Sequence, residues 1–467
     1  MLNELKTPRC EYSRDPMIAC ALEGVASVAA GLDDVAIVIH APQGCAATAN
    51  QAFDAHEIDF SSRRIACSRL FETDIIMGAT EKLRDLVLQA DRSYGASTIF
   101  VVGTCAADII GEDIAAVCRS LLGKVRARLV PIMAGGFRGD AFAGMDLGLD
   151  ALLGLMGEGK PSPAPGDAGS LVRSPPERLS SRPPAASLLL PQASSNPTWW
   201  ADAEWARGVL EELSGGPCLA FPRGTTTAEL AAVASSGACA LLSHDAGFRF
   251  ARELERRGSP WIMKDLPLPI GIENTGRWIR AAAAFFDRSR EAEELIARGE
   301  SMVTEILRRR ALMIIPRYRN CRVAISADAT LAIPLVRTLY LELEMIPEIV
   351  LLKGSSPEAR GLLERELGDL GISPLVVFDA DGWAIAEALR EREVDAVLGS
   401  SWERYIAEEL GIRIVFDVVA PTSRDLYVDR PYFGYEGFLN LLEAMGNSWE
   451  EALRSKRIAW EQFEEAE

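Results

Sequence analysis

The cysteines are the residues of this sequence best suited to chemistry. An odd number of cysteines does not suit a framework of disulfides, so we expect core residues, cluster ligands or nucleophiles. Cys45, Cys67 and Cys105 lie in the first quarter of the chain, among glycines and other small residues. They are the first candidates for a metal site. The full set of nine is at positions 10, 20, 45, 67, 105, 118, 218, 239 and 321.

The three candidates have the spacing C-x21-C-x37-C, which lacks the close pair of a typical zinc site. Three thiolates are one ligand short of a cubane iron–sulfur cluster. Either Cys20 completes the set or another chain does. The alternative is that all three thiols are small core residues, because free cysteine is among the most buried residue types.

The surroundings of these thiols favour an anionic cluster. Gly44 precedes Cys45 and lets the backbone come close to a bound group. A helix is expected directly after Cys105, and helix N-termini attract anions.

The first third of the chain alternates between two patterns. Short β-branched runs bounded by glycine and proline predict buried parallel strands, and the amphipathic runs between them predict helices. The strands are expected at 34–42, 97–104 and 127–133, and the helices at 72–90 and 106–122. This alternation is typical of a doubly wound α/β domain.

Two of the three thiols follow these strands directly. Cys45 comes after the run at 34–42, and Cys105 comes after the run at 97–104. Ligands in open α/β sheets gather outside the carboxyl ends of the strands. Cys67 precedes a predicted helix, so we expect all three thiols on one rim of the first sheet.

The same alternation resumes after a segment rich in proline and serine, and a length of 467 residues suits three domains. The expected fold class is α/β, with three Rossmann-like domains whose parallel sheets are flanked by helices. The expected divisions are a cluster-binding domain at 1–158, a Pro/Ser-rich insert or linker at 159–198, a second α/β domain at 199–285, and a third with C-terminal helices at 286–467.

The charge balance excludes several classes of partner. Lys plus Arg number 49 and Asp plus Glu number 67, a net charge of −18, which argues against nucleic acid and anionic membranes. No apolar run approaches the 18 or so residues of a membrane span. The first residues show no secretory pattern, so we expect a cytoplasmic protein.

Common catalytic motifs are absent from the sequence. There is no G-x-x-x-x-G-K-[ST] for a P-loop, no G-x-G-x-x-G after a strand, no G-x-S-x-G and no H-E-x-x-H. The three histidines, at 40, 56 and 244, are far apart in the sequence. A nucleotide site or a histidine-based zinc site therefore has no support, and a three-domain binding protein with buried thiols remains as the simplest alternative to a cluster protein.

At the cysteines the chain resembles the nitrogenase component 1 superfamily. The resemblance rests on several motifs in the same order, and it runs through roughly 18–157 and 216–450. The matching segments are CALEGVASVAAGL (20–32), HAPQGCA (40–46), ACSRLFETDIIMGATEKL (66–83), GTCAADIIGEDI (103–114), LPLPIGIENTGRWIR (266–280) and FDVVAPTSRDLYVDRPYFGYEGFLNLLEAMGN (416–447).

The resemblance implies a ligand set. Members pair an α-type with a β-type subunit, and the two share a bridging P-cluster, [8Fe-7S], with three cysteines from each. Carried over, Cys45, Cys67 and Cys105 are the ligands from this side, and Gly44 and Gly136 border the cluster. Cys20 matches a position that serves as a fourth ligand in the α-type subunit of the cofactor-assembly scaffold, which leaves a [4Fe-4S] cluster as the fallback.

The resemblance also implies the subunit type. The α-type subunit holds the active-site cofactor on one cysteine and one histidine. Here Ser243 and His244 stand where that cysteine is expected, and the C-terminal region has no histidine. We therefore expect a β-type subunit that contributes no catalytic residue of its own.

Two departures from the conventional β subunit point to a nitrogenase-like reductase. Gly135-Gly136-Phe137 replaces Pro-Ser-Phe, which removes a serine able to ligate the oxidised P-cluster, and AFDAHEIDFSSRR (52–64) replaces another family segment. Methylthio-alkane reductase fits best among the relatives with separate α and β chains. A nitrogenase β subunit that reduces dinitrogen and a cofactor-assembly scaffold subunit remain alternatives.

The implied function is electron relay. An ATP-dependent iron-protein dimer would dock transiently and pass electrons through the shared cluster to an α-subunit metallocofactor, for multi-electron reduction of a small molecule, with C–S cleavage of a methylthio-alkane favoured. The missing P-loop agrees, because the ATPase is a separate chain. The implied assembly is an α₂β₂ heterotetramer.

Overall fold

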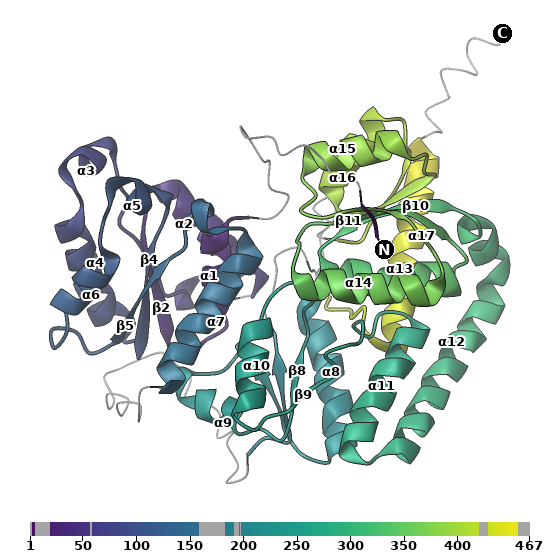
Figure 1. Ribbon diagram of the computed structural model, residues 1–467, viewed down its shortest axis with the longest axis horizontal. Coiled ribbons are helices and arrows are strands. Elements are labelled where there is room, and N and C mark those ends of the chain that lie inside the picture. Colours follow the sequence, from purple (N-terminus) through teal and green to yellow (C-terminus); the bar gives the residue numbers. More distant parts are fainter. Residues whose placement is uncertain are drawn as a thin grey trace.

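Three parallel sheets, each flanked by helices, form the protein (Figure 1). This confirms the expected α/β class. The computed structural model describes residues 2–4, 19–56, 58–157, 183–190, 196, 198–419 and 428–455. Cys10 lies outside these residues. Within them, no helix is both long enough and apolar enough to cross a membrane.

The first sheet has the strand order β3-β2-β4-β5, and all its neighbours are parallel. Alternate side chains of β2 and β4 enter two apolar clusters, so the sheet is buried on both faces. One face packs on α1, α2 and α7, and the other on α4 and α6. The strands are β2 (Val35–His40), β3 (Ile65–Cys67), β4 (Thr98–Gly103) and β5 (Arg128–Met133), and the helices are α1 (Ala21–Ala30), α2 (Gln43–Ala55), α4 (Thr80–Tyr94), α6 (Ile114–Ser120) and α7 (Ala141–Gly157).

Glycines break the two long helices that the sequence predicts here. Gly78 has φ +81° and Gly111 has φ +71°, a conformation that favours glycine and ends a helix. Each predicted helix is therefore two helices, with the short α3 (Glu72–Met77) and α5 (Cys105–Ile110) preceding α4 and α6. The two short helices contact each other at the carboxyl end of the sheet.

The second sheet has the strand order β7-β6-β8-β9. Its apolar face is continuous with that of the first sheet, because Leu189, Phe221 and Leu241 share one cluster with α1 and α7. The strands are β6 (Ala186–Leu189), β7 (Cys218–Phe221), β8 (Cys239–Leu241) and β9 (Trp261–Ile262), and the helices are α8 (Trp199–Ser214), α9 (Leu230–Ala234) and α10 (Phe248–Arg256).

The third sheet has the strand order β1-β12-β11-β10-β13-β14, and α11 and α12 connect it to the second. Its strands are β1 (Asn3–Glu4), β10 (Arg322–Ala327), β11 (Ile346–Leu352), β12 (Leu375–Val377), β13 (Ala396–Gly399) and β14 (Ile414–Asp417). The helices of this part are α11 (Ile272–Phe286), α12 (Ser289–Tyr318), α13 (Ala329–Glu342), α14 (Pro357–Leu370), α15 (Gly382–Glu391), α16 (Ser401–Glu409) and α17 (Gly434–Ser455).

Two segments form strands of sheets to which the sequence-based domain divisions did not assign them. The segment 159–198 was expected to be an insert or linker, but its residues Ala186–Leu189 form β6, fully buried between β7 and β8. Asn3–Glu4 was expected in the first domain, but it forms β1 and pairs with β12 of the third sheet. Residues 159–182, 191–195 and 197 of the expected insert lie outside the described part.

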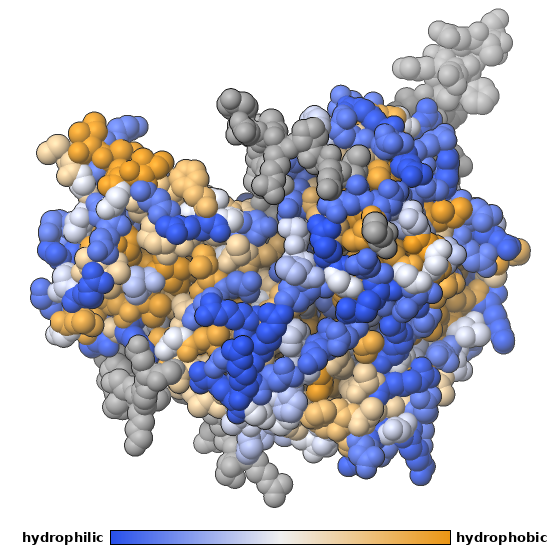
Figure 2. Space-filling view, in the orientation of Figure 1, coloured by the Kyte–Doolittle hydropathy of each residue, from blue (hydrophilic) through white to orange (hydrophobic). Residues whose placement is uncertain are grey.

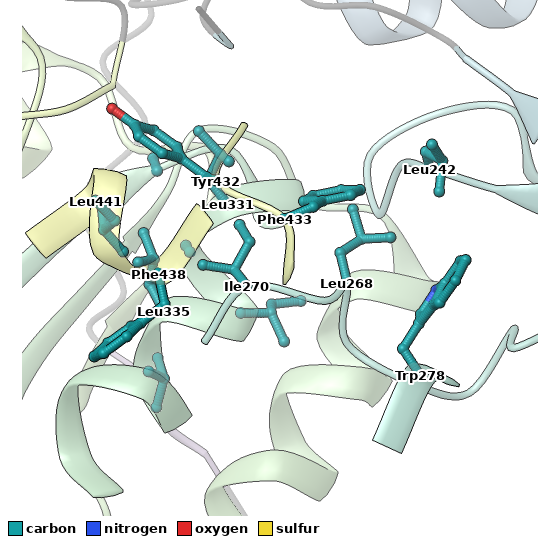
Figure 3. Close-up of a cluster of buried hydrophobic side chains, with 14 of the residues drawn as sticks. Leu242, Leu268, Ile270, Trp278, Leu331, Leu335, Tyr432, Phe433, Phe438 and Leu441 are labelled. Atoms are coloured by element: carbon teal, nitrogen blue, oxygen red, sulfur yellow. The ribbon is translucent and has the colours of Figure 1, made fainter. Parts of the chain in front are cut away.

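One apolar cluster ties the second and third sheets to the C-terminal helix. Figure 3 shows Leu268, Ile270 and Trp278 in one group with Leu331 and Leu335 of α13. Phe438 and Leu441 of α17 complete this group. All these side chains are buried. Burial of this kind stabilises by about 25 cal/mol per Å² of apolar surface, so the cluster fixes the third domain against the second.

A close helix contact fixes the first domain. A Cβ on Gly24 of α1 would lie 1.9 Å from the carbonyl oxygen of Ala141, and one on Gly144 of α7 would lie 1.9 Å from that of Ala21. The two helices therefore pack backbone against backbone, as only glycine allows.

We expect Gly144→Ala to lower the free energy of unfolding by about 1–3 kcal/mol, because the added methyl group forces α7 away from α1. Gly154→Ala is the matched control on the same helix, since a Cβ there meets nothing within 4 Å. It should be neutral or stabilising by up to about 1 kcal/mol. Urea denaturation followed by circular dichroism measures both, and equal effects would contradict the close contact.

Candidate metal centre

Four partly exposed thiols lie together at the carboxyl edge of the first sheet. Cys67 is the last residue of β3, Cys45 lies in the first turn of α2 after β2, and Cys105 begins α5 after β4. Cys20 precedes α1 and forms an isolated bridge with Asp140, which brings it to the same rim. All four are half-buried and unpaired.

The four thiols are close enough for the other three to affect the pKa of Cys45. Burial raises the pKa of the Cys45 thiol, and the neighbouring Cys20, Cys105 and Cys67 raise it further. Burial also raises the pKa of Cys67, against the opposing charges of Arg69 and Lys82. The Cys45 and Cys67 thiolates therefore need a compensating positive charge, which iron would supply.

The loop at Gly135-Gly136 holds Cys105 in place. The Gly136 N–H donates to the Cys105 Sγ at 2.9 Å. A Cβ on Gly136 would lie 3.6 Å from both the Cys105 Sγ and the Cys20 Cβ, so this residue sits between the two cysteines. A Cβ on Gly135 would lie 2.6 Å from the Cys105 backbone nitrogen, so that position admits only glycine.

The donor set suits a multi-iron cluster. Among the described residues, no three Cys, His, Asp or Glu side chains lie close enough to hold one metal ion. The thiolates of an iron–sulfur cluster bind different irons, and N–H donors to their sulfurs are common there. The Arg69 N–H donates to the Cys67 Sγ at 3.4 Å, a second such bond. Because a Cβ on Gly44 would meet nothing within 4 Å, the space beside Cys45 is open.

Comparison with known families agrees with this arrangement. The model of the family described as "Nitrogenase component 1 type Oxidoreductase" matches residues 20–450. The chain belongs to this family. Membership makes it a subunit of an oxidoreductase complex, as the sequence analysis expected.

The relatives within the family include several subunit types. The chain is 25% identical to the nitrogenase vanadium-iron protein beta chain of Trichormus variabilis, over 93% of each chain. It is 24% identical to the nitrogenase iron-molybdenum cofactor biosynthesis protein NifE of Methanococcus maripaludis, over 93% of this chain and 84% of that one. The solved structure of "Nitrogenase Cp1 at pH 6.5" superposes with a TM-score of 0.73 at 17% identity, over 97% of this chain and 96% of that one, which confirms the fold. Sequence identity therefore does not distinguish the subunit types, and the geometry of the site has to do so.

An apolar surface adjoins the thiols. Phe71, Ile76 and Met77, at the start and end of α3, are exposed, Met77 to 84%, as are Ile109 of α5 and Phe137 beside Gly136. Figure 2 shows this surface as the orange area over α3 and α5. Apolar groups gathered at one edge in this way mark protein interaction sites.

Two features of the site were missed by the sequence analysis. Arg138 and Asp108 form an ion pair at 2.9 Å that joins the glycine loop to α5 beside Cys105. His40 is fully buried at the end of β2, and neither ring nitrogen has a hydrogen-bond partner among the described residues. Burial lowers the pKa of His40, so it is neutral. The only signal in the sequence was its place in the HAPQGC segment.

The remaining described thiols are core residues. Cys118, Cys218, Cys239 and Cys321 are buried, and burial raises the pKa of Cys118 to about 11 and that of each of the other three to about 12. They stay protonated at neutral pH and are poor metal ligands. This includes Cys239, the thiol closest in sequence to Ser243.

Ser243 lines a small cavity where the three domains meet. The cavity has about 30 Å³, room for about two water molecules. His244 accepts a hydrogen bond from the Leu268 N–H at 3.2 Å, and burial lowers its pKa to about 3, so it is a neutral core histidine. A metallocofactor has no room here. The cavity is lined by Phe142, Leu190, Asn196, Trp199, Asp202, Leu242, Ser243, Asp328, Thr330 and Phe433.

We expect Gly135→Ala to reduce the iron content of the purified complex several-fold, because the methyl group displaces the Cys105 backbone. Gly154→Ala on α7 is the control, because a Cβ there meets nothing within 4 Å and the residue is not part of the thiol rim, so it should keep the wild-type iron content. Iron analysis per chain measures both. Equal iron in the two variants would show that the Gly135 contact does not position Cys105.

We expect the stability to fall as the pH rises from about 4 to about 7, through Asp202. Burial raises the pKa of Asp202 to about 7, although Thr198 and the N–H groups of Tyr432 and Phe433 donate to it. The folded state therefore favours the protonated form, and its contribution is complete below the unfolded pKa of about 3.8 and lost above about 7.

Asp202→Asn tests this, because the amide oxygen can still accept from the N–H groups of Tyr432 and Phe433 while the uncharged NH2 donates to the Thr198 hydroxyl oxygen. The wild type should lose stability between pH 4.5 and pH 8, whereas the variant should not. At about 1.4 kcal/mol per pKa unit, the free energy of unfolding of the variant relative to the wild type should therefore rise by more than 1 kcal/mol between these pH values. Urea unfolding at the two pH values measures the gain. A difference that does not change with pH would refute the assignment.

Proposed function

We propose that this chain is the β-type subunit of a nitrogenase-like reductase and that it holds one side of an iron–sulfur cluster shared with an α-type subunit. The observation that carries the proposal is the set of half-buried thiols on one exposed rim, bordered by apolar surface. Cys45, Cys67 and Cys105 would bind the cluster, and Gly44 and Gly136 leave room for it. A bound cluster of the P-cluster type, [8Fe-7S], would supply one-electron steps.

The chain's own residues position and protect that group. The N–H groups of Gly136 and Arg69 donate to the sulfurs of Cys105 and Cys67, as is common at the sulfurs of an iron–sulfur cluster. The Asp108–Arg138 ion pair fixes the glycine loop against α5. The apolar side chains around α3 and α5 would exclude water once covered by the α-type subunit or by the ATP-dependent iron-protein dimer.

The cavity at Ser243 supports the β-type assignment. Without space or a thiol at this position, the active-site cofactor belongs in the α-type partner, and this chain contributes no catalytic residue. We infer a multi-electron reduction, with C–S cleavage of a methylthio-alkane favoured because Gly135-Gly136 replaces the family's Pro-Ser. Reduction of dinitrogen by the same assembly is the alternative.

The assembly we propose is a heterotetramer of two α-type and two β-type chains, working in the cytoplasm, where ATP for the iron protein is available. Within the chain, we propose the cluster domain up to about residue 158 and later domains at 199–285 and 286–467. The strands β1 and β6 then belong to the third and second domains.

The position of Cys20 favours a second candidate function. It is the foremost of the thiols that raise the pKa of Cys45. Four thiols complete the ligand set of a [4Fe-4S] cluster within this chain alone. That arrangement would suit a cofactor-assembly scaffold, which transfers a group and does not turn over substrate.

Co-purification with the α-type chain tests the main proposal. We expect Cys105→Ala to abolish the cluster signal in electron paramagnetic resonance and to remove the iron of that cluster. Cys118→Ala is the matched control in the same domain; it leaves a small buried cavity, costs about 1 kcal/mol and keeps the iron. Wild-type protein without iron would overturn the proposal.

The iron count and Cys20→Ala separate the two candidates. At least eight irons per αβ pair, unchanged in Cys20→Ala, support the shared cluster. About four irons in the chain purified alone, lost in Cys20→Ala, support the scaffold.

A further inference from the structure

The helix α16 presents two large aromatic side chains to solvent. Trp402 is 62% exposed and Tyr405 is 69% exposed. Residues three apart lie on the same side of a helix, so the two rings form one surface, which we call the α16 face. The other side of the helix is anchored in the core, because Glu403 and Ala407 are fully buried. The α16 face is therefore held by a rigid support.

The described part of the chain ends beside this face. The last helix, α17, ends at Ser455, one turn after Glu451, and the Glu451 carboxylate lies 3.6 Å from the Arg404 guanidinium of α16. Figure 1 shows the C-terminal end of α17 next to α15 and α16. Residues 456–467 follow and lie outside the described part. An extended segment of this length spans about 40 Å, so it can reach every part of the α16 face.

The composition of this C-terminal segment suits the α16 face. The segment contains Ile458, Trp460 and Phe463, and four glutamates follow Trp460. Aromatic rings attract one another beyond the effect of the area that they bury. The glutamates suit Arg404, which is 23% exposed and whose contacts with two carboxylates, at 3.6 and 3.8 Å, are longer than hydrogen bonds.

We propose that residues 456–467 bind back on α16 of the same chain and cover Trp402 and Tyr405, with Trp460 and Phe463 as the buried side chains. Tryptophan and tyrosine are enriched among the residues that contribute most to protein contacts. Because the segment is joined to α17 beside the face, its effective concentration there is high and a small contact is sufficient. The contact lies in the third domain and does not rest on the proposed function.

Trypsin tests this contact in the full chain, because Lys456 and Arg457 are cleavage sites at the start of the segment. We expect Trp402→Ala with Tyr405→Ala to speed cleavage there on the order of ten-fold or more, because cleavage follows the population of the open form. Mass spectrometry of the shortened chain measures the rate. Both side chains are exposed, so the variant should fold as the wild type does, which circular dichroism checks.

Variants of the segment test the other side of the contact. Trp460→Ala with Phe463→Ala should speed cleavage by the same factor. If the two sets of side chains touch each other, the variant that combines all four substitutions is cleaved no faster than either double variant. Phe60→Ala is the matched control, because Phe60 is an exposed aromatic residue, at 81%, in the first domain. It should be cleaved at the wild-type rate.

Three results would overturn the contact. One is an unchanged rate in either double variant, and another is a pair of effects that multiply in the combined variant. The third is loss of the α-type subunit from the complex of Trp402→Ala with Tyr405→Ala, which would make the α16 face a surface for that subunit. The iron content should be the same in all these variants, so failure of the cluster proposal is recognised separately.

Discussion

The site depends on the parallel, in-register pairing of β2 with its two neighbours. Ile39 lies opposite Cys67, and His40 lies opposite Gly103, so three strands end at the same level. Each chain segment then turns into a helix directly outside the sheet, and the cysteines stand at those turns. A slip of one residue would move Cys67 to the other face, because side chains alternate along a strand. The thiols are therefore placed by backbone hydrogen bonds rather than by contacts with one another.

The positions of Cys45 and Cys105 could be predicted, because strand ends bounded by small residues are local signals. Cys20 could not be placed in this way. It precedes the sheet, and the Ala21 N–H donates to the carbonyl of Gly139, more than a hundred residues later. The strand β6 was hidden for a different reason. Its four apolar residues lie within a proline-rich stretch, and only the pairing with β7 and β8 reveals them.

Burial separates the cysteines into two chemical classes. The four in the cores of the three domains keep their protons, because a thiolate there has no compensating charge. The four at the rim are half-exposed, and two of them, Cys67 and Cys105, accept hydrogen bonds from backbone N–H groups, so this rim is open to a bound cluster. Composition does not distinguish these classes, since both occur among small and apolar neighbours. The local accessibility of each thiol does.

The small cavity beside Ser243 also limits how the subunit types of this family can interconvert. A single substitution could place a thiol at Ser243, but it would face a space for about two water molecules, lined by Trp199 and Phe433 and by the buried Asp202 and Asp328. A chain of this shape would first have to lose several large side chains. If the α-type partner holds its cofactor at the corresponding position, as we propose, the two subunit types differ there in cavity volume as well as in the ligand, and the volume is the harder difference to reverse.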